Sequence, residues 1–315
     1  MSNSLQKQEV KIDDDRKRVK DKADRATIDN CLDPRTLYVL DKMVINKKIN
    51  KLEGCISTGK EANVYHATGN TDLSDHELRP LEPDEEGNPT ASRLYAVKIF
   101  KTSILIFKDR ERYVEGEFRF RKGHCKGNPR KMVKLWAEKE VRNLKKIGHT
   151  NGLIKVPHPW IFKNNIIVMD FIGTGDDAAP RLKDAGLSEW TNAYEQTLLV
   201  IRRMYQRCKL VHADLSEYNL LWHEGEIWVI DVSQAVETEH PMALDFLRRD
   251  CGIINDFFIK KNVNTITTKD TFYFTTSINI ENDDETDTLT DLLNRAVQRN
   301  EKEKEEDRVQ DAVFK

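Results

Sequence analysis

The sequence has few of the features that mark secreted, zinc-binding or membrane-spanning proteins. No two cysteines stand in a Cys-x-x-Cys pair, and the five cysteines are scattered: Cys31, Cys55, Cys125, Cys208 and Cys251. Their odd number and wide spacing argue against a zinc site or a disulfide scaffold and favour reduced thiols. The first residues are too polar for a signal peptide, and no apolar run approaches the roughly 18 residues of a membrane span. We therefore expect a soluble cytosolic or nuclear protein.

The sequence does have enough apolar material for a core, together with a strongly charged surface. Of its 315 residues, 38% are hydrophobic and 33% are charged, and the net charge is -2. This length leaves room for one two-lobed catalytic domain or for two small domains. The near-neutral balance argues against a polycation that binds nucleic acid along its whole length.

The first half of the chain predicts short strands around one long helix. An amphipathic helix is expected to follow Asp33-Pro34, with Leu37, Leu40 and Val44 on its apolar face. Strands are expected at 51–57, 62–67, 94–100 and 165–172, and a long helix from about 131 to 147.

The second half predicts mostly helices. One helix is expected from an N-cap at Ser188, with an apolar face formed by Tyr194, Leu198, Ile201 and Tyr205. A hairpin is expected at 220–230, turning at Glu224-Gly225. Another helix is expected to open at Pro241 and to run through Leu244, Leu247 and Ile254.

The strongest chemical signal is the segment His-Ala-Asp-Leu-Ser-Glu-Tyr-Asn at 212–219. Asp214 and Asn219 have the spacing of a protein-kinase catalytic loop, and Asp231 follows the apolar hairpin at the place of the metal-binding aspartate. Phosphoryl transfer needs a carboxylate that faces the attacking oxygen, and an amide and a second carboxylate that hold metal against the phosphates. Asp and Asn are also common in ordinary turns. The presence of Asp231 at the expected place argues against the interpretation that Asp214 and Asn219 are only turn residues.

A second signal is Tyr-Ala-Val-Lys at 95–98, which matches the strand lysine that binds ATP phosphates in kinases. An exposed strand lysine is the plainer reading of Lys98. The following helix supports the kinase reading, because Glu140 stands where the carboxylate that pairs with this lysine is expected, with Glu138 as the alternative. With Trp136 on the packed side, Glu140 is expected near the edge of that side.

A third signal is the glycine-containing segment 54–61, which has the Gly-x-x-x-x-Gly-Lys pattern of a phosphate-binding P-loop. That reading needs Ser or Thr next, but Glu61 stands there, and the alternating residues that follow predict a strand instead of a helix. A strand–turn–strand loop over the phosphates fits better, with Ser57, Thr58 and Gly59 nearest to them. A plain hairpin turn is the alternative.

A fourth signal is the apolar strand at 166–173, which runs into a glycine as the hinge between two kinase lobes would. Backbone groups of Asp170 and Ile172 are then expected to bind the adenine, with Met169 behind it. A simple core strand explains the apolar run equally well.

Together, the strings STGKEANVYHA, VKIFKTSILIFKDR, EFRFRKGHCKGNPRKMVKLWAEKE, LVHADLSEYN and IDVSQ closely resemble the RIO family of atypical serine/threonine protein kinases, in particular its Rio-one subfamily. The resemblance covers about residues 45–260. It implies an α+β, two-lobed protein-kinase-like fold. The N-lobe has an antiparallel sheet plus a helix, and the C-lobe is mainly helical. No long activation segment is expected, and no Ala-Pro-Glu motif follows Asp231.

We expect this fold to divide the chain into four segments. These are a charged flexible arm at 1–33, an N-terminal helix and N-lobe at 34–172, a C-lobe at 173–280 and an acidic helix or tail at 281–315. An acidic insert at 70–92 and a basic loop at 101–131 are expected within the N-lobe.

The resemblance also implies residue roles. Asp214 is then the proton acceptor, Asn219 and Asp231 bind Mg²⁺ (with Mn²⁺ as the alternative metal), and Asp231 takes the phosphoryl group as an aspartyl-phosphate. Lys98 binds the ATP phosphates. The family further implies serine autophosphorylation and action in the cytoplasm, with shuttling through the nucleus as an option. The implied partner is a pre-40S ribosomal particle, including its rRNA and assembly factors.

The basic loop has two readings. From residue 101 to 134 there are eleven Lys or Arg and four Asp or Glu, with aromatic residues between them. Such a stretch is typical of contact with rRNA, and it is equally typical of a solvated loop that folds over a nucleotide.

Three functions are compatible with these residues. The first is an ATPase whose nucleotide state controls binding to a ribosomal precursor. The second is a serine kinase that phosphorylates other proteins, although the short distance from Asp231 to Pro241 leaves no room for a docking segment. The third is a non-catalytic assembly factor that only binds nucleotide.

Overall fold

The computed structural model describes residues 32–69, 93–102, 113, 128–277 and 285–313, and only the backbone of 303–313. The arm up to residue 31, the acidic insert and most of the basic loop lie outside these ranges. The described residues form two compact units: 32–69, 93–102 and 160–169 belong to the first, and 113, 128–159, 170–277 and 285–313 to the second. The predicted lobe boundary between residues 172 and 173 stays a prediction.

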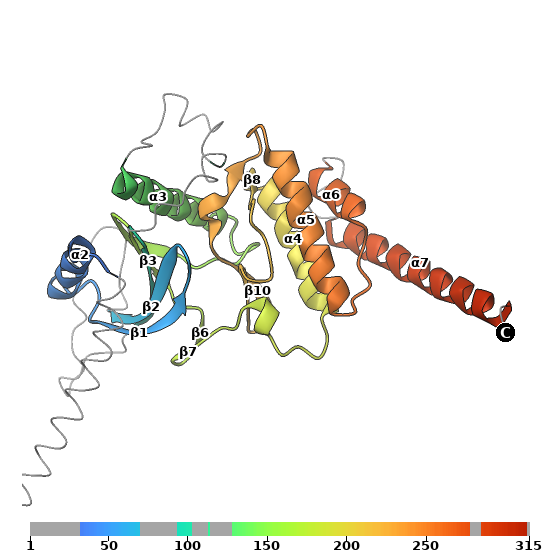
Figure 1. The fold of residues 1–315 in the computed structure, drawn as a ribbon, viewed down its shortest axis with the longest axis horizontal. Coiled ribbons are helices and arrows are strands. Elements are labelled where there is room, and N and C mark those ends of the chain that lie inside the picture. The colour runs from blue at the N-terminus through green and yellow to red at the C-terminus, as the bar shows by residue number, and fades with distance from the viewer. Residues whose placement is uncertain (1–31, 70–92, 103–112, 114–127, 278–284, 314–315) are drawn as a thin grey trace, which may run out of the picture. The chain divides into compact units, whose positions relative to one another are not determined.

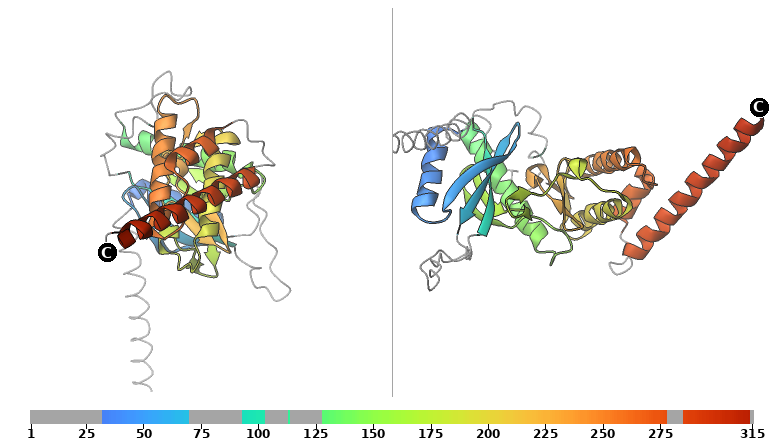
Figure 2. Two further views of the ribbon diagram at one scale, coloured as in Figure 1. Left: turned by 90° about the vertical axis from the view of Figure 1, so that its right-hand side faces the viewer. Right: turned by 90° about the horizontal axis from the view of Figure 1, so that it is seen from below.

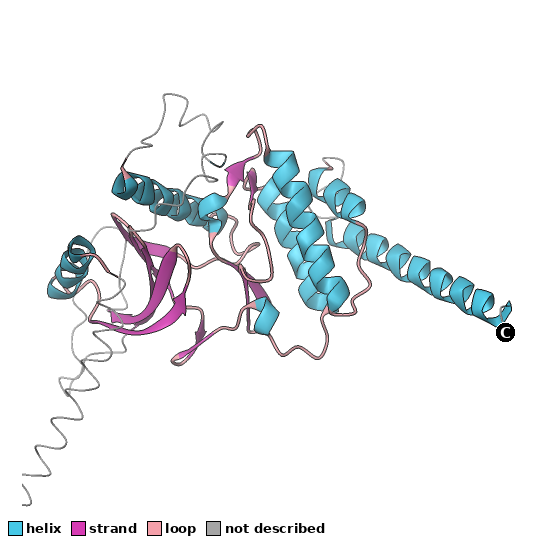
Figure 3. Ribbon diagram, viewed as in Figure 1, coloured by secondary structure: helices cyan, strands magenta, loops and turns pink. Residues whose placement is uncertain are grey.

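The first unit is a sheet with one helix, α2 (Pro34–Ile45) (Figure 1). The sheet has the order β1-β2-β3-β5-β4, and β1, β2 and β3 pair antiparallel (Figure 3). Its strands are β1 (Lys51–Thr58), β2 (Ala62–Gly69), β3 (Arg93–Phe100), β4 (Pro159–Lys163) and β5 (Ile166–Asp170).

The core of this unit lies between α2 and the sheet. Alternate residues of a strand point to the same face, and Tyr95, Val97 and Ile99 of β3 are all buried in one cluster with Leu40 and Met43 of α2. Asp33 caps α2 by accepting hydrogen bonds from the N–H groups of residues 35 and 36. Helix α2 and strands β1, β2 and β3 thus form where the sequence predicted them, whereas β4 was not predicted.

The second unit is mostly helical. Its helices are α3 (Pro129–Gly148), α4 (Thr191–Gln206), α5 (Ala243–Lys260), α6 (Thr268–Thr276) and α7 (Glu285–Val313). Short strands connect them: β6 (Gly173–Thr174), β7 (Asp177–Ala178), β8 (Leu210–Val211), β9 (Leu220–His223), β10 (Glu226–Val229) and β11 (Val236–Glu237). Two 3-10 turns are η3 (Leu182–Asp184) and η4 (Val232–Gln234). Figure 2 shows the C-terminal part of α7 extending away from α4, α5 and α6.

Helices α4, α5 and α6 share a core that includes hydrogen bonds. The rings of Tyr194 and Phe258 pack against each other in a tilted arrangement, with 5.0 Å between centroids. The hydroxyl of Tyr194 donates to Asn255 Oδ1 at 2.8 Å, and Asn255 Nδ2 donates to the carbonyl of Ile266 at 3.1 Å. Burial raises the pKa of Tyr194 above its usual range, so it stays a neutral donor.

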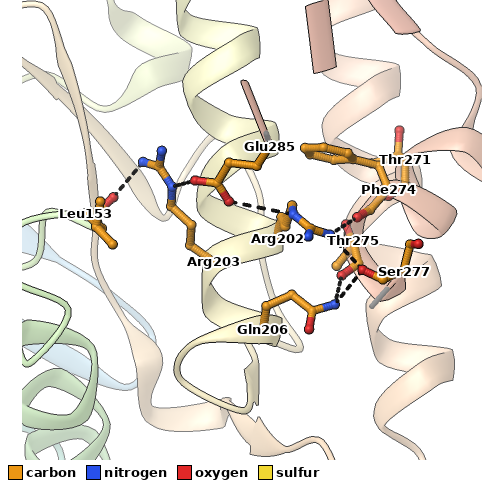
Figure 4. Close-up of polar contacts among 9 residues, drawn as sticks. All are labelled: Leu153, Arg202, Arg203, Gln206, Thr271, Phe274, Thr275, Ser277 and Glu285. Carbon is orange, nitrogen blue, oxygen red and sulfur yellow. Dashed lines mark hydrogen bonds and ion pairs between the residues drawn. The ribbon is translucent and has the colours of Figure 1, made fainter. Parts of the chain in front are cut away.

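Helix α7 is attached to this core by ion pairs (Figure 4). Glu285 accepts from Arg203 Nε at 2.6 Å and lies 3.6 Å from Arg202 Nε. Arg202 also donates to the carbonyls of Phe274 and Ser277 at the end of α6. The side chains of Arg202 and Glu285 are only 1% and 7% exposed, so these charges are shielded from water.

Several boundary predictions were wrong. Helix α4 begins at Thr191 instead of after Ser188, and Glu189 Oε1 accepts from the Thr191 N–H at 3.0 Å. Helix α5 begins at Ala243, two residues after Pro241. Strand β5 ends at Asp170 instead of residue 172.

Two apolar residues are exposed where burial was predicted. Val44 and Leu244 are 39% and 49% exposed, whereas their neighbours Met43 and Ala243 are buried. A helical face about 100° wide admits several sets of apolar positions, and the sequence did not distinguish them. In the described part of the chain, no helix is both long and apolar enough to cross a membrane.

Candidate active site

The predicted catalytic loop follows β8 and is held by a buried carboxylate from α5. Asp250 accepts from the N–H groups of Ala213 at 2.8 Å and Leu215 at 3.1 Å, the two residues that flank Asp214. Ala213 has a φ of 67°, a left-handed conformation that is unfavourable for a residue with a Cβ. Arg249 Nη2 donates to the Ala213 carbonyl at 2.6 Å. Three bonds thus fix the backbone around Asp214.

Burial has a large effect on Asp250. It raises the pKa of this carboxyl to about 7, against the opposing effect of the hydrogen bonds from Leu215 and Ala213 and the charge of Arg249. Both carboxyl oxygens of Asp250 accept a hydrogen bond from a backbone N–H group of the loop. The ionised carboxylate, which has only acceptors, is therefore the form that best satisfies both N–H groups.

Asn219 and Asp231 are brought together by the hairpin. Strands β9 and β10 pair Leu220 with Val229, and the Ile230 N–H donates to the Asn219 carbonyl at 3.0 Å, which extends the pairing by one step. The turn between the strands has positive φ at both Glu224 (51°) and Gly225 (80°), as a two-residue type I′ hairpin requires.

Asp231 itself has a left-handed backbone, with φ 58° and ψ 54°. Strained conformations of this kind persist only where neighbouring groups hold them. Asn143 of α3 donates to the carbonyls of Val232 at 2.9 Å and Ala235 at 3.4 Å, and Ser233 Oγ donates to Asp231 Oδ1 at 3.1 Å. The backbone after Asp231 is thus held from α3, while Ser233 binds the carboxylate of Asp231.

His212 completes the connection between the loop and the hairpin. Its Nε2 lies 3.2 Å from the Ile230 carbonyl, and because a carbonyl only accepts, Nε2 carries the hydrogen. Burial lowers the pKa of His212, so the ring is neutral and serves as a structural donor.

The side-chain oxygens of Asn219 and Asp231 are ligands of the kind that fits a magnesium ion bound together with a nucleotide. Asn219 Nδ2 donates to the Asp214 carbonyl at 2.9 Å, which turns its Oδ1 to the other side of the amide. Mg²⁺ commonly takes one or two protein oxygens and completes its shell with phosphate and water. Within the described ranges, no three His, Cys, Asp or Glu residues lie close enough together to hold a metal by themselves.

In the first unit, the glycine-containing segment is a strand–turn–strand. Ser57 and Thr58 end β1, and β2 begins at Ala62, so no helix follows the glycine and the P-loop reading is excluded. A Cβ on Gly59 would lie 2.9 Å from the Ala62 carbonyl, which is why the turn needs glycine. Lys101 Nζ donates to the Gly59 carbonyl at 2.6 Å, which places an unpredicted cation beside this turn.

Lys98 and Glu140 are both buried, on β3 and α3. Lys98 is 6% exposed and Glu140 1% exposed, whereas Glu138 is exposed to solvent. Glu140 was expected at the edge of the packed side of its helix, but it lies four residues after buried Trp136, in the middle of that side. Because Lys98 and Glu140 belong to different units, their pairing stays a prediction.

The predicted hinge residues have part of their backbone in use. The Asp170 N–H donates to the His158 carbonyl at 3.0 Å, and the Ile172 carbonyl accepts from the Ala179 N–H at 2.9 Å. That these residues bind adenine stays a prediction. Position 173 requires glycine, because a Cβ there would collide with the Asp177 carbonyl across the β6–β7 turn.

Four side chains around the loop and the hairpin were not predicted: Asn143, Ser233, Arg249 and Asp250. A signal for two of them was present. Asp250 stands three residues after Leu247 and four before Ile254, and Asn143 stands seven residues after Trp136 and four before Ile147, so both are polar residues at core positions of helices. A polar residue at such a position must satisfy a specific partner.

Comparison with known proteins now identifies the family. The family model for the RIO domain matches residues 63–271, most of the chain, including every site residue above except the glycine-containing turn. The chain belongs to the RIO family. The RIO match begins within β2 and ends within α6.

Curated RIO proteins give a more detailed likeness. Over 271 residues, the chain is 51% identical to the serine/threonine-protein kinase RIO1 of Homo sapiens, which covers 85% of this chain and 44% of that protein. Identity to the serine/threonine-protein kinase RIO1 of Saccharomyces cerevisiae is 50% over 269 residues, covering 83% and 55%. The chain spans about half the length of the curated relatives it matches.

A solved RIO structure supports the fold. The crystal structure of the Rio2 kinase ADP/Mg²⁺-phosphoaspartate complex from Chaetomium thermophilum matches with a TM-score of 0.51 and 18% identity, covering 84% of this chain and 75% of that chain. The predicted RIO-type kinase fold is confirmed.

Proposed function

We propose that this chain is the kinase domain of a RIO-type enzyme that uses ATP and Mg²⁺ for phosphoryl transfer. One arrangement carries the proposal. The loop with Asp214 and Asn219 is bonded to the segment before Asp231 through the Ile230 N–H and carbonyl. That arrangement gathers a base and two metal-binding oxygens, as phosphoryl transfer requires.

The first step of the proposed reaction takes place at Asp231. One carboxylate oxygen of Asp231 forms a bond to the γ-phosphorus of ATP, the bond from that phosphorus to the bridging oxygen breaks, and ADP leaves with the electron pair. The named Rio2 complex contains a phosphoaspartate, which makes this acceptor reasonable in a protein of the same fold. Bound Mg²⁺ would neutralise phosphate charge, held by Asn219 and Asp231.

The second step returns the enzyme to its free state. Water forms a bond to the phosphorus, the phosphorus–oxygen bond to Asp231 breaks, and phosphate is released while one water proton passes to Asp214 or to solvent. Lys98, buried on β3, would stabilise the phosphates of ATP by its charge.

A second candidate is transfer to a serine or threonine of the enzyme or of another protein. The human and yeast relatives are named serine/threonine-protein kinases, which favours this acceptor. The chemistry differs only in the attacking oxygen, which would be a hydroxyl that loses its proton to Asp214.

One experiment separates these functions from simple nucleotide binding. Purified protein is incubated with γ-labelled ATP and Mg²⁺, and free phosphate, labelled enzyme and a labelled added protein are followed. Free phosphate with hydroxylamine-labile label supports the aspartyl-phosphate, efficient labelling of added protein supports the kinase, and tight binding without turnover would contradict both.

A matched pair of variants tests the acceptor. Asp231→Asn should abolish the hydroxylamine-labile label, because an amide cannot attack the phosphorus, while Asp245→Asn, an exposed change on α5, should keep it. Label that persists in Asp231→Asn would remove Asp231 from this role.

The cellular setting is proposed from the family resemblance. We propose that the enzyme acts in the cytoplasm on a pre-40S particle, where its nucleotide state controls binding and release. Co-sedimentation with small-subunit precursors in ADP and in a non-hydrolysable ATP analogue tests this; equal binding in both states would contradict the switch.

A further inference from the structure

The side chain of Asp231 has a dedicated hydrogen-bond donor. Ser233 Oγ lies 3.1 Å from Asp231 Oδ1, two residues along the η4 turn, and the residue Ser233 is 0% exposed. A hydroxyl that is fully shielded from water has a strong requirement for an acceptor, and here the acceptor is the carboxylate of the proposed phosphoryl acceptor.

This hydroxyl is not needed to hold the backbone. The backbone around Asp231 has separate supports, since Asn143 Nδ2 binds the carbonyls of Val232 and Ala235 and His212 Nε2 binds that of Ile230. None of these bonds involves Ser233. The Ser233 hydroxyl therefore acts on the carboxylate alone.

The strength of that bond changes during the proposed reaction. The free carboxylate carries a full negative charge, and hydrogen bonds to charged acceptors are about twice as strong as those to neutral ones. Once Asp231 is phosphorylated through its other oxygen, Oδ1 becomes the neutral carbonyl oxygen of an acyl phosphate. The bond from Ser233 weakens when the intermediate forms and strengthens again when it is hydrolysed.

We propose that Ser233 is a positioning residue that, acting through Asp231, speeds hydrolysis of the aspartyl-phosphate. In that step water forms a bond to phosphorus, the bond from phosphorus to the Asp231 oxygen breaks, and its electron pair returns to the carboxylate. The Ser233 hydroxyl stabilises the charge that develops there. This inference rests on the proposed function, because it needs the intermediate at Asp231.

The test is a chase of labelled enzyme. Wild type and Ser233→Ala are labelled with γ-labelled ATP and Mg²⁺, then mixed with excess unlabelled ATP, and loss of hydroxylamine-labile label and release of free phosphate are followed. Loss of one hydrogen bond to a developing charge should slow the decay about tenfold and increase the labelled fraction at steady state.

Three further variants keep the outcome clear. Ser233→Thr retains the hydroxyl, and its label should decay fast, as in wild type. Ser233→Cys keeps the size of the side chain but has only a weak donor, and its label should decay slowly. These two variants decide the question even if the alanine variant fails to fold. Thr197→Ala removes another fully buried hydroxyl, which donates to the Ala193 carbonyl at 2.7 Å on α4, and its decay should equal that of wild type.

The two proposals fail in different ways. Decay of Ser233→Ala and Ser233→Cys within twofold of wild type overturns the role of Ser233 and leaves the aspartyl-phosphate intact. A wild-type enzyme that hydrolyses ATP but never carries the label overturns the intermediate and this inference with it.

Discussion

Two regions of the helical unit each contain a buried carboxylate, and the two are held differently. Asp250 on α5 accepts from backbone N–H groups on both sides of Asp214. Glu285 at the start of α7 meets the side chains of Arg202 and Arg203 (Figure 4). Backbone donors cannot follow a displaced carboxylate, whereas guanidinium groups on flexible side chains can. We therefore expect Asp250 to determine the rate of catalysis and Glu285 to determine only stability.

The largest effect is expected from Glu285→Gln. Removing one partner of a buried ion pair leaves uncompensated charge on Arg202, so the free energy of unfolding should fall by about 3 kcal/mol. Turnover of ATP should stay within about twofold of wild type at a temperature where both proteins are folded. Urea unfolding and a phosphate-release assay measure the two quantities.

A control on the same helix sharpens that result. Asp291 is an exposed acidic residue of α7, and Asp291→Asn should change the free energy of unfolding by no more than about 0.5 kcal/mol. If Glu285→Gln lowers turnover tenfold or more, the ion pairs of Glu285 are coupled to the loop around Asp214. That result would contradict the expected difference between the two regions.

Asp250→Asn is expected to lower the free energy of unfolding less than Glu285→Gln does, and to lower kcat more. An amide cannot accept from both the Ala213 and Leu215 N–H groups, so one of them loses its partner at a cost of about 2 kcal/mol. If the loop around Asp214 loosens accordingly, kcat should fall about thirtyfold. Asp245→Asn, exposed on the same helix, is the matched control and should leave kcat unchanged.

The pH dependence of stability gives a second measurement on the same variant. The pKa of Asp250 is raised by burial to about 7, next to the charges of Arg249 and Asp214, so from about pH 4 to about pH 7 the folded protein binds a proton that the unfolded chain releases. The stability contributed by this carboxyl is therefore lost as pH rises through that window. Asp250→Asn should remove this dependence; an unchanged pH profile would contradict the assignment.

The smallest effect is expected from Gln196→Ala on α4. Gln196 Nε2 donates to the Gly225 carbonyl at 2.8 Å, and its Oε1 accepts from the Ile227 N–H at 2.9 Å, which holds the hairpin that leads to Asp231. Its loss should lower the free energy of unfolding by about 1 kcal/mol and kcat by less than about fivefold. Asn192 Oδ1 also accepts from Gln196 Nε2, at 3.2 Å, so Asn192→Ala removes that bond alone and should lower kcat less than Gln196→Ala does; an equal loss of kcat would contradict the role of Gln196.

Local sequence predicted the elements because local physics forms them. The helix that follows Asp33-Pro34 and the hairpin that turns at Glu224-Gly225 each depend on neighbouring residues, and each is found as predicted. The start of α4 was missed because Ser188 is a good cap by type, while Glu189 provides the actual acceptor.

The supports of the site could not be read from motifs in the same way. Asp250 is 36 residues after Asp214, and Asn143 is 89 residues before Val232, so only the fold brings them together. The motif predicted which residues would do the chemistry, since their spacing within the loop is local. It did not predict what holds them, because those partners come from other helices.

The bond between Asn143 and the carbonyl of Val232 restricts where α3 can change in length. Each residue of an α-helix turns the chain by about 100°, and Glu140 and Asn143, three residues apart, leave the helix on nearly the same face. Two residues inserted between them would place them five apart, about 140° around the helix, and would turn Glu140 away from that face while Asn143 kept its partner. An insertion ahead of Pro129 would leave the spacing within the helix unchanged, so one end of this helix tolerates insertions and deletions that its middle does not.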